Sequence, residues 1–162
     1  MENNTNEIYE QMRKKVEALK STEKRRSADE AMSLQFESDV YSFSPEDKTL
    51  TLSFPVLKKE LNPNGAMIGG LICTAIDMTY GILVYGLTEG KSIPPTITMT
   101  TNFINPIMFG DTLLVTAKIE SWGKRIINMT AVGTSKNNGK TIVTSTTSFI
   151  SDKSFRPLEL NK

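Results

Sequence analysis

The feature that most constrains the fold is one long segment, Leu61 to Thr88, in which Asp77 is the only charged residue. Residues 66–87 of this segment have helical spacing, and a helix of that length runs about 30 Å. Its two sides would carry Ile68, Ile72, Ile76, Thr79 and Leu83 on one and Gly70, Thr74, Asp77 and Gly81 on the other. A helix that is apolar or small nearly all round is typical of a buried position. The sequence therefore predicts one long helix enclosed by the rest of the fold.

On either side of this helix, the sequence from residue 36 onward is patterned as strands. Before it, residues 36–43 and 48–56 flank a turn-forming Ser-Pro-Glu-Asp sequence. After it come four segments rich in Thr, Val and Ile: Thr96–Ile104, Thr112–Ser121, Ile126–Ser135 and Thr141–Ser151. The pair Asn138-Gly139 is a strong signal for a tight hairpin. Strands joined mostly by hairpins predict an antiparallel β-sheet that wraps the helix, which is an α+β architecture.

The domain boundaries follow from this pattern: one α+β domain over residues 36–152, a helical arm over 1–35 and a tail over 153–162. In the arm, apolar residues recur near helical spacing, and Ser27 with Glu30 fits a capping box. The arm holds seven basic and seven acidic residues. A solvated amphipathic arm that packs on the domain is therefore the favoured interpretation, and a DNA-reading arm is the weaker alternative.

Composition excludes several classes of function. The net charge is +1, from 19 basic and 18 acidic residues, which gives no electrostatic case for nucleic acid or a membrane surface. No apolar run reaches the roughly 20 residues expected of a membrane span. The polar, acidic start MENNTNEIYEQ is unlike a secretory signal. One cysteine excludes an internal disulfide, so we expect a cytoplasmic protein.

The chain contains no histidine, and this absence removes whole mechanisms. Ser-His-Asp and Cys-His nucleophiles, HExxH metal sites and a histidine general base are all excluded. Catalysis would have to use a carboxylate, Lys, Tyr, a hydroxyl or the backbone, and no metal or other cofactor is expected. Cys73 has no histidine partner and lies on the predicted buried helix, so a role in packing rather than catalysis is favoured.

Asp77 needs an explanation, because an ionised carboxylate in a buried helix costs several kcal/mol unless it is paired or hydrogen-bonded. No cation lies within a turn or two on either side of it. In a structural explanation, Asp77 bonds to backbone or to a hydroxyl such as that of Thr74, or it faces water at the helix edge. In a functional explanation, it lines a cleft as a base or nucleophile. Composition leaves both open.

Gly69 and Gly70 favour the functional explanation. They lie in the first turn of the predicted helix, where backbone N–H groups have no intrahelical partner. Glycine lets a ligand approach that backbone closely, and the helix N-terminus favours a developing negative charge. An oxyanion donor followed two turns later by a carboxylate would make a hydrolytic site. Tight packing of the helix on the sheet is the alternative and, for the glycines alone, the commoner explanation.

The run Asn62-Pro-Asn-Gly-Ala-Met-Ile-Gly-Gly70, with Asp77 seven residues on, resembles the hotdog-fold thioesterases of the PaaI and acyl-CoA thioesterase 13 type. Their pattern is N-x-x-G-x-x-H-G-G, followed by Asp seven residues after the second glycine. The segments PTITMTTNFINPIMFGDTL and SWGKR are similar to a strand, a loop and a hairpin of the same family. The resemblance covers about residues 36–151. It implies a hotdog fold, an antiparallel sheet around one central helix.

The same resemblance implies a homodimer, often paired into a tetramer, with active sites at the subunit interface. Asp77 of one chain would be nucleophile or general base, and Gly70 of the other would donate its N–H to the thioester carbonyl. Asn62 would hold the substrate or the attacking water. Thr96 falls where the family often has Ser or Thr near that water, although an ordinary strand residue is the simpler explanation.

One position departs from the family pattern: Ile68 replaces the histidine before the two glycines. In the family this histidine usually supports the site rather than attacking the substrate, so its loss need not end hydrolysis. Ile68 and Gly69 would contact substrate in a more apolar pocket. Lys124 and Arg125 would meet the phosphates of coenzyme A, although an exposed pair of hairpin charges is the commoner explanation. Four methionines suggest an adaptable pocket or simple core filling: Met67, Met78, Met99 and Met108.

Two functional hypotheses remain. The first is an acyl-CoA or acyl-carrier thioesterase, with acyl-CoA and further copies of the chain as its partners. The second is a non-catalytic hotdog protein that senses acyl-CoA, suggested by the missing histidine. A dehydratase of the same fold is disfavoured, because that chemistry resembles a histidine-assisted one.

Overall fold

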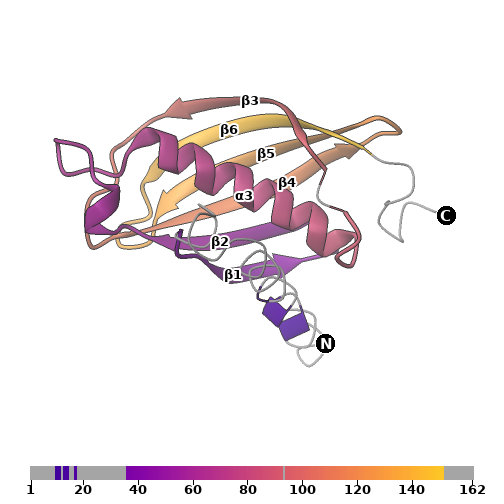
Figure 1. Ribbon diagram of the computed structural model, residues 1–162, viewed down its shortest axis with the longest axis horizontal. Helices are drawn as coiled ribbons and strands as arrows, with labels where there is room; N and C mark the ends of the chain where they lie inside the picture. The colour runs from indigo at the N-terminus through magenta and orange to yellow at the C-terminus, as the bar shows by residue number, and fades with distance from the viewer. Residues whose placement is uncertain (1–9, 12, 15–16, 18–35, 93, 152–162) are drawn as a thin grey trace.

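The computed structural model describes residues 10–11, 13–14, 17, 36–92 and 94–151 of the chain, and Figure 1 shows their arrangement. In chain order the elements are β1 (Asp39–Ser44), β2 (Thr49–Pro55), the short 3₁₀ helix η1 (Lys58–Glu60), α3 (Gly69–Leu87), β3 (Thr96–Phe103), β4 (Thr112–Trp122), β5 (Ile126–Ser135) and β6 (Thr141–Ile150). Each strand predicted from sequence is present within a few residues of its expected bounds. The described residues of the arm are helical. The rest of the arm, including the expected capping box, and residues 152–162 lie outside the described residues.

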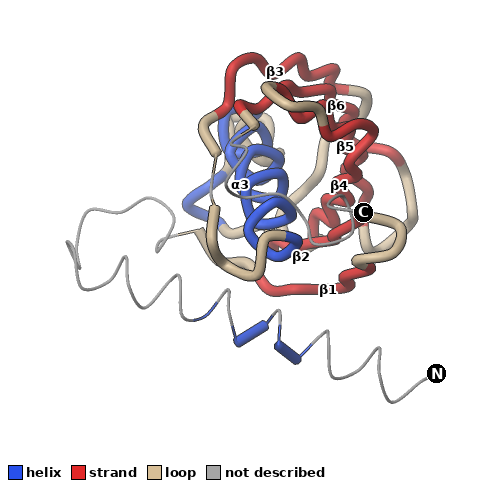
Figure 2. Tube along the Cα trace, turned by 90° about the vertical axis from the view of Figure 1, so that its right-hand side faces the viewer, coloured by secondary structure: helices blue, strands red, loops and turns tan. Residues whose placement is uncertain are grey.

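The strands form one antiparallel sheet of six, in the order β1-β2-β4-β5-β6-β3. The sheet curves around α3, so that β1 and β3 lie at its two ends with the helix between them (Figure 2). The predicted fold class, an antiparallel sheet wrapped around one long helix, is confirmed. β3 is an edge strand, and no strand in the described part of the chain pairs with its outer edge.

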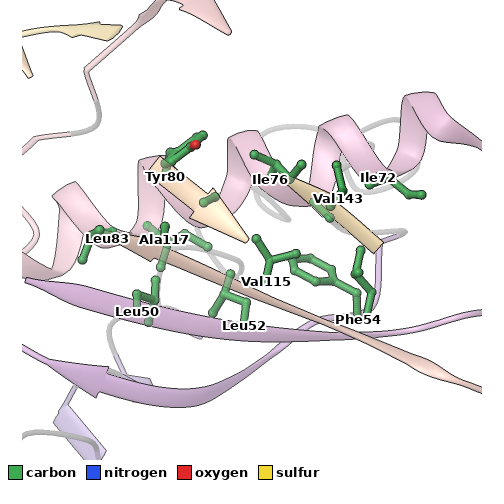
Figure 3. Packing of buried hydrophobic residues seen from close by; sticks show 14 of the residues in the cluster. Leu50, Leu52, Phe54, Ile72, Ile76, Tyr80, Leu83, Val115, Ala117 and Val143 are labelled. Atoms are coloured by element: carbon green, nitrogen blue, oxygen red, sulfur yellow. The ribbon is translucent and has the colours of Figure 1, made fainter. Parts of the chain in front are cut away.

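The core lies between α3 and the concave face of the sheet. Alternate residues of β2 point toward the helix, as the period of two predicted. They meet the inward-facing residues of β4, β6 and α3 (Figure 3), and the labelled set comprises Leu50, Leu52, Phe54, Ile72, Ile76, Tyr80, Leu83, Val115, Ala117 and Val143. All of these are buried, so one side of α3 is fixed by packing on the sheet.

The other side of α3 differs from the sequence-based prediction. Gly70 and Asp77 are exposed, so the helix is not enclosed all round in a single chain. The helix begins at Gly69 rather than at residue 66, because Ile68 has an extended backbone (φ −62°, ψ 131°) and caps it. Helical spacing therefore does not extend to Ile68, and its side chain is 42% exposed rather than part of the buried face. Gly70, a small residue that seemed suited to burial in the chain's own core, faces outward instead.

By length and composition alone, α3 is long and apolar enough to cross a membrane. The expectation that no apolar run reaches that length is therefore wrong, since helices of 17–25 residues can span. One or two such helices are weak signs of a membrane protein, and the core helix of a soluble fold passes the same test. Here the apolar side of α3 packs on the sheet, which accounts for its composition.

Candidate active site

Asp77 and Thr96, two residues singled out from sequence, are in contact. The hydroxyl Oγ1 of Thr96 donates a hydrogen bond of 2.7 Å to Oδ1 of Asp77. Asp77 lies near the middle of α3 and Thr96 is the first residue of β3, so the bond joins the helix to the open edge of the sheet. Both residues are exposed. The carboxylate is thus accessible, and its second oxygen accepts no hydrogen bond from the described part of the chain.

A β-bulge turns the Thr96 side chain toward α3. Thr96 opposes Phe149 of β6, whereas Thr98 opposes Ser148, so Ile97 is an extra residue in the ladder. Phe149 is buried on the concave side, and Thr96 therefore points to that side as well. In a regular ladder Ile97 would oppose Phe149, and Thr96 would point to the outer face, away from Asp77.

Asp77 belongs to the outward-facing stripe of α3, together with Gly70, Thr74 and Gly81. The Thr74 hydroxyl donates to the carbonyl of Gly70 at 3.0 Å, so it does not satisfy Asp77. The structural explanation is therefore wrong about Thr74. Its other parts hold in a single chain, because a hydroxyl, that of Thr96, bonds to the carboxylate and the side chain is exposed. Small residues flank the carboxylate on this face, so another molecule can approach it closely.

The helix N-terminus presents free donors on the same side. Ile68 is the N-cap and makes no side-chain cap bond, and its carbonyl accepts from the N–H of Leu71 (2.9 Å) and Ile72 (3.2 Å). Among the described residues, no carbonyl accepts from the N–H of Gly69 or Gly70. A Cβ added at Gly70 would meet nothing within 4 Å. The start of α3 is therefore an open site with unpaired N–H groups, as the sequence predicted.

Comparisons with known proteins agree with this geometry. Residues 64–142 match the family model of the thioesterase superfamily. None of the curated proteins matches the sequence significantly. Thioesterase superfamily member 2 of zebrafish superposes with a TM-score of 0.70 at 19% identity, over 90% of this chain and 96% of that one. This chain has the hotdog fold.

Two further hotdog structures support the assignment. The PaaI protein of E. coli superposes with a TM-score of 0.70 at 16% identity, covering 88% of this chain and 94% of that one. The smu.793 protein of Streptococcus mutans, solved bound to acetyl CoA, superposes with a TM-score of 0.64 at 22% identity, covering 72% of this chain and 90% of that one. The resemblance to hotdog-fold thioesterases stated from sequence motifs is thereby confirmed.

Asn62 shapes the loop that leads into α3 of this hotdog domain. Its Oδ1 accepts from the N–H of Asn64 (2.9 Å) and of Ala66 (3.2 Å), and its own N–H donates to the Ala66 carbonyl at 2.7 Å. Gly65 follows in the left-handed region (φ 77°), which glycine adopts without strain. Because the Asn62 oxygen is used within the loop, its amide Nδ2 is the group left for a substrate or a water. Its predicted role stays a prediction.

Lys124 and Arg125 are exposed on the β4–β5 hairpin, beside a groove of about 570 Å³ that Trp122 and Ile126 also line. One row of the sheet joins this hairpin to the site: Trp122 opposes Ile127, Ile127 opposes Phe149, and Phe149 opposes Thr96. Three strand spacings place Trp122 about 14 Å from Thr96. The two basic residues thus lie at the same end of the sheet as Thr96, without touching Asp77.

Phe103 is a site residue that sequence reasoning missed. It ends β3 and opposes Val143 on the concave side of the sheet. Its ring reaches the first turn of α3, where Cζ lies 3.2 Å from the position that a Cβ on Gly69 would take. The side chain is nevertheless 55% exposed. No local sequence signal marks it, because Phe103 lies 34 residues from Gly69 in the chain and the β3 register that brings the two together is not visible in sequence.

Cys73 is half-buried on α3, and the structure does not assign it a role. Within the described ranges, no group of three or more His, Cys, Asp and Glu residues is placed to hold a metal ion.

Proposed function

We propose that this hotdog protein hydrolyses the thioester of an acyl-CoA or acyl carrier, at a site completed by a second copy of the chain. The observation that carries the proposal is the outward stripe of α3. It holds an accessible carboxylate, Asp77, oriented by Thr96, and an unpaired N–H at Gly70. A carboxylate and an oxyanion donor are the two groups that thioester hydrolysis needs.

One α3 cannot supply both groups to the same carbonyl. Asp77 follows Gly70 by seven residues, which is about 10 Å of helix. A reacting carbonyl has to lie roughly 3 Å from the base, or from the water that it activates, and from the oxyanion donor. A second copy related by a two-fold axis, with its helix antiparallel, brings its Asp77 beside Gly70 of the first. Two equivalent sites result.

The open edge of β3 provides a surface for that second copy. An unpaired strand edge is a template for pairing with another chain. Antiparallel pairing of β3 with itself would extend the sheet and place the two α3 helices next to each other across the axis. Ile97, near the start of β3, is an exposed apolar residue that such pairing would cover. We therefore propose a homodimer, with pairing of dimers into a tetramer as the further expectation.

In the proposed reaction, Asp77 accepts a proton from a water, and the water oxygen attacks the thioester carbon. The N–H of Gly70 in the other copy stabilises the negative charge that develops on the carbonyl oxygen. Collapse breaks the carbon–sulfur bond, and Asp77 returns the proton to the leaving thiolate. Direct attack by Asp77, followed by hydrolysis of the anhydride, uses the same groups. Thr96 holds one carboxylate oxygen and leaves the other free, and the Nδ2 of Asn62 is available to position the water.

The remaining predicted contacts belong to substrate binding. Lys124 and Arg125 would bind the phosphates of coenzyme A, and the pantetheine arm spans the separation of about 14 Å to Thr96. Ile68 and Gly69 would line the pocket at the helix N-terminus. The relative solved with acetyl CoA supports a CoA ester as the ligand. No nucleic acid or membrane partner is expected from the balanced charge, and the cytoplasm is the expected compartment.

The test is a panel of acyl-CoA esters with detection of the free thiol. We expect Asp77→Asn to lower kcat by about 10²–10⁴ fold, the range for loss of a general base. The matched control is Glu46→Gln, which changes an exposed carboxylate in the β1–β2 turn and should keep wild-type rates. If the wild type hydrolyses none of the esters, or Asp77→Asn hydrolyses them as well as the wild type, the proposal fails.

A second candidate, a non-catalytic acyl-CoA sensor, is favoured by one observation. The N-cap of α3 is Ile68, an exposed aliphatic residue that cannot hydrogen-bond to a carbonyl or to Asn62. Calorimetry that finds tight acyl-CoA binding without release of thiol would favour this candidate. The equal numbers of acidic and basic residues in 1–35 argue against a DNA-binding head there.

A further inference from the structure

We infer that Phe103 is the specificity-determining residue that limits the size of the acyl group. The inference rests on the proposed function, because it assumes an acyl thioester bound at Gly70. Phe103 spans the gap between the end of β3 and the first turn of α3. Its Cζ and Cε1 lie 3.2 Å and 3.3 Å from the position of a Cβ on Gly69. The ring thus stands one residue away from the proposed oxyanion donor.

Gly69 and Gly70 differ in what surrounds them. Nothing lies within 4 Å of a Cβ built on Gly70, whereas a Cβ on Gly69 would press against the Phe103 ring. The surface beside Gly70 is therefore open to a thioester carbonyl, and we infer that the group attached to that carbonyl passes beside the ring. The Phe103 ring is therefore placed to set how much room that group has.

The pairing also explains why residue 69 is a glycine. The glycines with positive φ are Gly65, Gly90, Gly110 and Gly139, so Gly69 has a backbone that any residue can adopt. Space, rather than backbone conformation, is what a side chain there would lack. A Cβ at 3.2 Å is closer than ordinary van der Waals contact, so Gly69→Ala would push the ring by a few tenths of an ångström. Gly69 and Phe103 are therefore coupled, and that coupling can be measured.

The surroundings of Phe103 suit an apolar group. Ile68 and Ile104 are exposed on the two segments that the ring connects, and Phe103 itself is more than half exposed. Exposed apolar side chains that gather at one place mark a surface that something else covers. An acyl chain that leaves the Gly70 site alongside the ring would cover these side chains, and each buried methylene would contribute to binding.

The test compares acetyl-, hexanoyl- and dodecanoyl-CoA as substrates of the full-length protein. Phe103→Ala should raise the dodecanoyl-to-acetyl ratio of kcat/KM by about tenfold or more, because it opens room for several methylenes. Phe103→Leu should raise it less. Gly69→Ala should lower the ratio, and this effect should vanish when Phe103→Ala is also present. The same ratio taken from the Kd values of the Asp77→Asn protein should move in the same directions.

The matched control is Phe109→Ala. Phe109 is an aromatic residue of similar exposure, 51%, and it lies on the β3–β4 connection against the Lys58 ammonium, 5.5 Å from the ring centre. Its removal should change the dodecanoyl-to-acetyl ratio by less than about twofold, since the ring does not lie against the α3 N-terminus. Gel filtration of every variant shows whether the assembly is intact.

The possible outcomes separate this inference from the proposed function. If the protein binds acyl-CoA esters but hydrolyses none of them, the proposed catalysis is wrong. The dodecanoyl-to-acetyl ratio of the Kd values then decides the role of Phe103. Unchanged ratios in Phe103→Ala and Phe103→Leu, with the assembly intact, overturn the inference while leaving catalysis standing. If Phe103→Ala does not fold, Phe103→Leu and Gly69→Ala decide, and a Gly69→Ala protein with the wild-type ratio overturns the inference. If no acyl-CoA ester binds, both the proposed function and the inference about Phe103 are wrong.

Discussion

The hydroxyl of Thr96 donates a hydrogen bond of 2.7 Å to the Asp77 carboxylate, from the first residue of an edge strand to the middle of the central helix. This contact fixes one carboxylate oxygen and turns the other toward open space. It also ties the position of the carboxylate to the position of β3, the strand that we expect a second copy to pair with. Catalysis and assembly would therefore depend on the same strand.

Loss of the Thr96 hydroxyl should slow hydrolysis without preventing folding. We expect Thr96→Val to lower kcat/KM by about tenfold, the value of one hydrogen bond to a charged group at an exposed site. Thr96→Ser keeps the hydroxyl and should stay close to the wild type. Thr98→Val is the matched control, because Thr98 lies beyond the bulge and opposes Ser148 on the outer face. Equal rates for Thr96→Val and the wild type would show that the bond does not orient the base.

Removal of one N–H at the start of α3 tests the oxyanion site. Gly70→Pro deletes that N–H, and the first turn of a helix tolerates proline because its N–H groups have no intrahelical partner. The preceding residue, Gly69, has no Cβ to clash with the proline ring. We expect kcat to fall by about 10²–10³ fold, as for loss of an oxyanion donor. Gly70→Ala keeps the N–H, and the two melting temperatures show whether the helix is intact.

Mixing two inactive variants tests whether the site is shared. In a dimer of one Asp77→Asn chain and one Gly70→Pro chain, one site has both intact groups and the other has neither. Random assembly of equal amounts makes half of the dimers mixed, so we expect about one quarter of the wild-type activity to return. Co-refolding followed by the thiol assay measures it. Activity that stays at the level of the separate variants would indicate that each chain carries a complete site or none.

Lys124 and Arg125 on the β4–β5 hairpin should bind the coenzyme A part of the substrate and not its acyl group. We expect the double variant Lys124→Ala, Arg125→Ala to raise KM for an acyl-CoA by about tenfold with kcat unchanged, because phosphate contacts contribute uniform binding. An S-acyl pantetheine lacks the nucleotide, so its hydrolysis should be unaffected. Lys118→Ala, an exposed cation on β4, is the control. An equal effect on both substrates would contradict the assignment.

Tyr80 should make the fold sensitive to alkali. Its side chain is fully buried against the sheet, and burial raises its pKa to about 12, with the nearby Ser145 hydroxyl offsetting part of that rise. Neither hydroxyl has a well-aligned hydrogen bond. An unfolded tyrosine loses its proton near pH 10, so the folded state holds the proton more tightly. Stability should be complete below pH 10 and fall by up to about 3 kcal/mol as the pH rises toward 12.

Tyr80→Phe isolates that effect. The ring keeps its edge-to-face contact with Phe149, whose centroid lies 6.0 Å away, and no good hydrogen bond is lost. We expect the free energy of unfolding at pH 7 to change by less than about 1 kcal/mol. Urea unfolding between pH 8 and 11 should show a shallower loss of stability than in the wild type. An unchanged pH dependence would mean that other groups, such as lysines, control alkaline unfolding.

The secondary structure could be read from the sequence because its signals are local. In β2 apolar residues alternate with threonine and serine, and the later strands are rich in Thr, Val and Ile. The turn residues include Gly139, whose φ of 73° the hairpin requires. The helical spacing of residues 66–87 also placed the helix start within three residues. These features depend on neighbours in sequence, which a single chain displays directly.

The site was less predictable because it depends on register and on contacts between distant segments. The bulge that turns Thr96 toward Asp77 follows from how β3 pairs with β6, and a strand pattern alone does not contain it. The contact of Phe103 with Gly69 has the same origin. The exposed side of α3 was taken for a buried one, because small and apolar residues are equally suited to a core and to a surface that another copy covers.

The bulge in β3 has an evolutionary consequence. Because Ile97 is a surplus residue, the alternation of side chains in the rest of β3 is uncoupled from the orientation of Thr96. Substitutions elsewhere in β3 can therefore change this edge of the sheet and the surface that packs on it during evolution. The Thr96 hydroxyl would keep its place beside the Asp77 carboxylate. The positions that keep the catalytic groups in place and the positions that set how copies associate can therefore change independently.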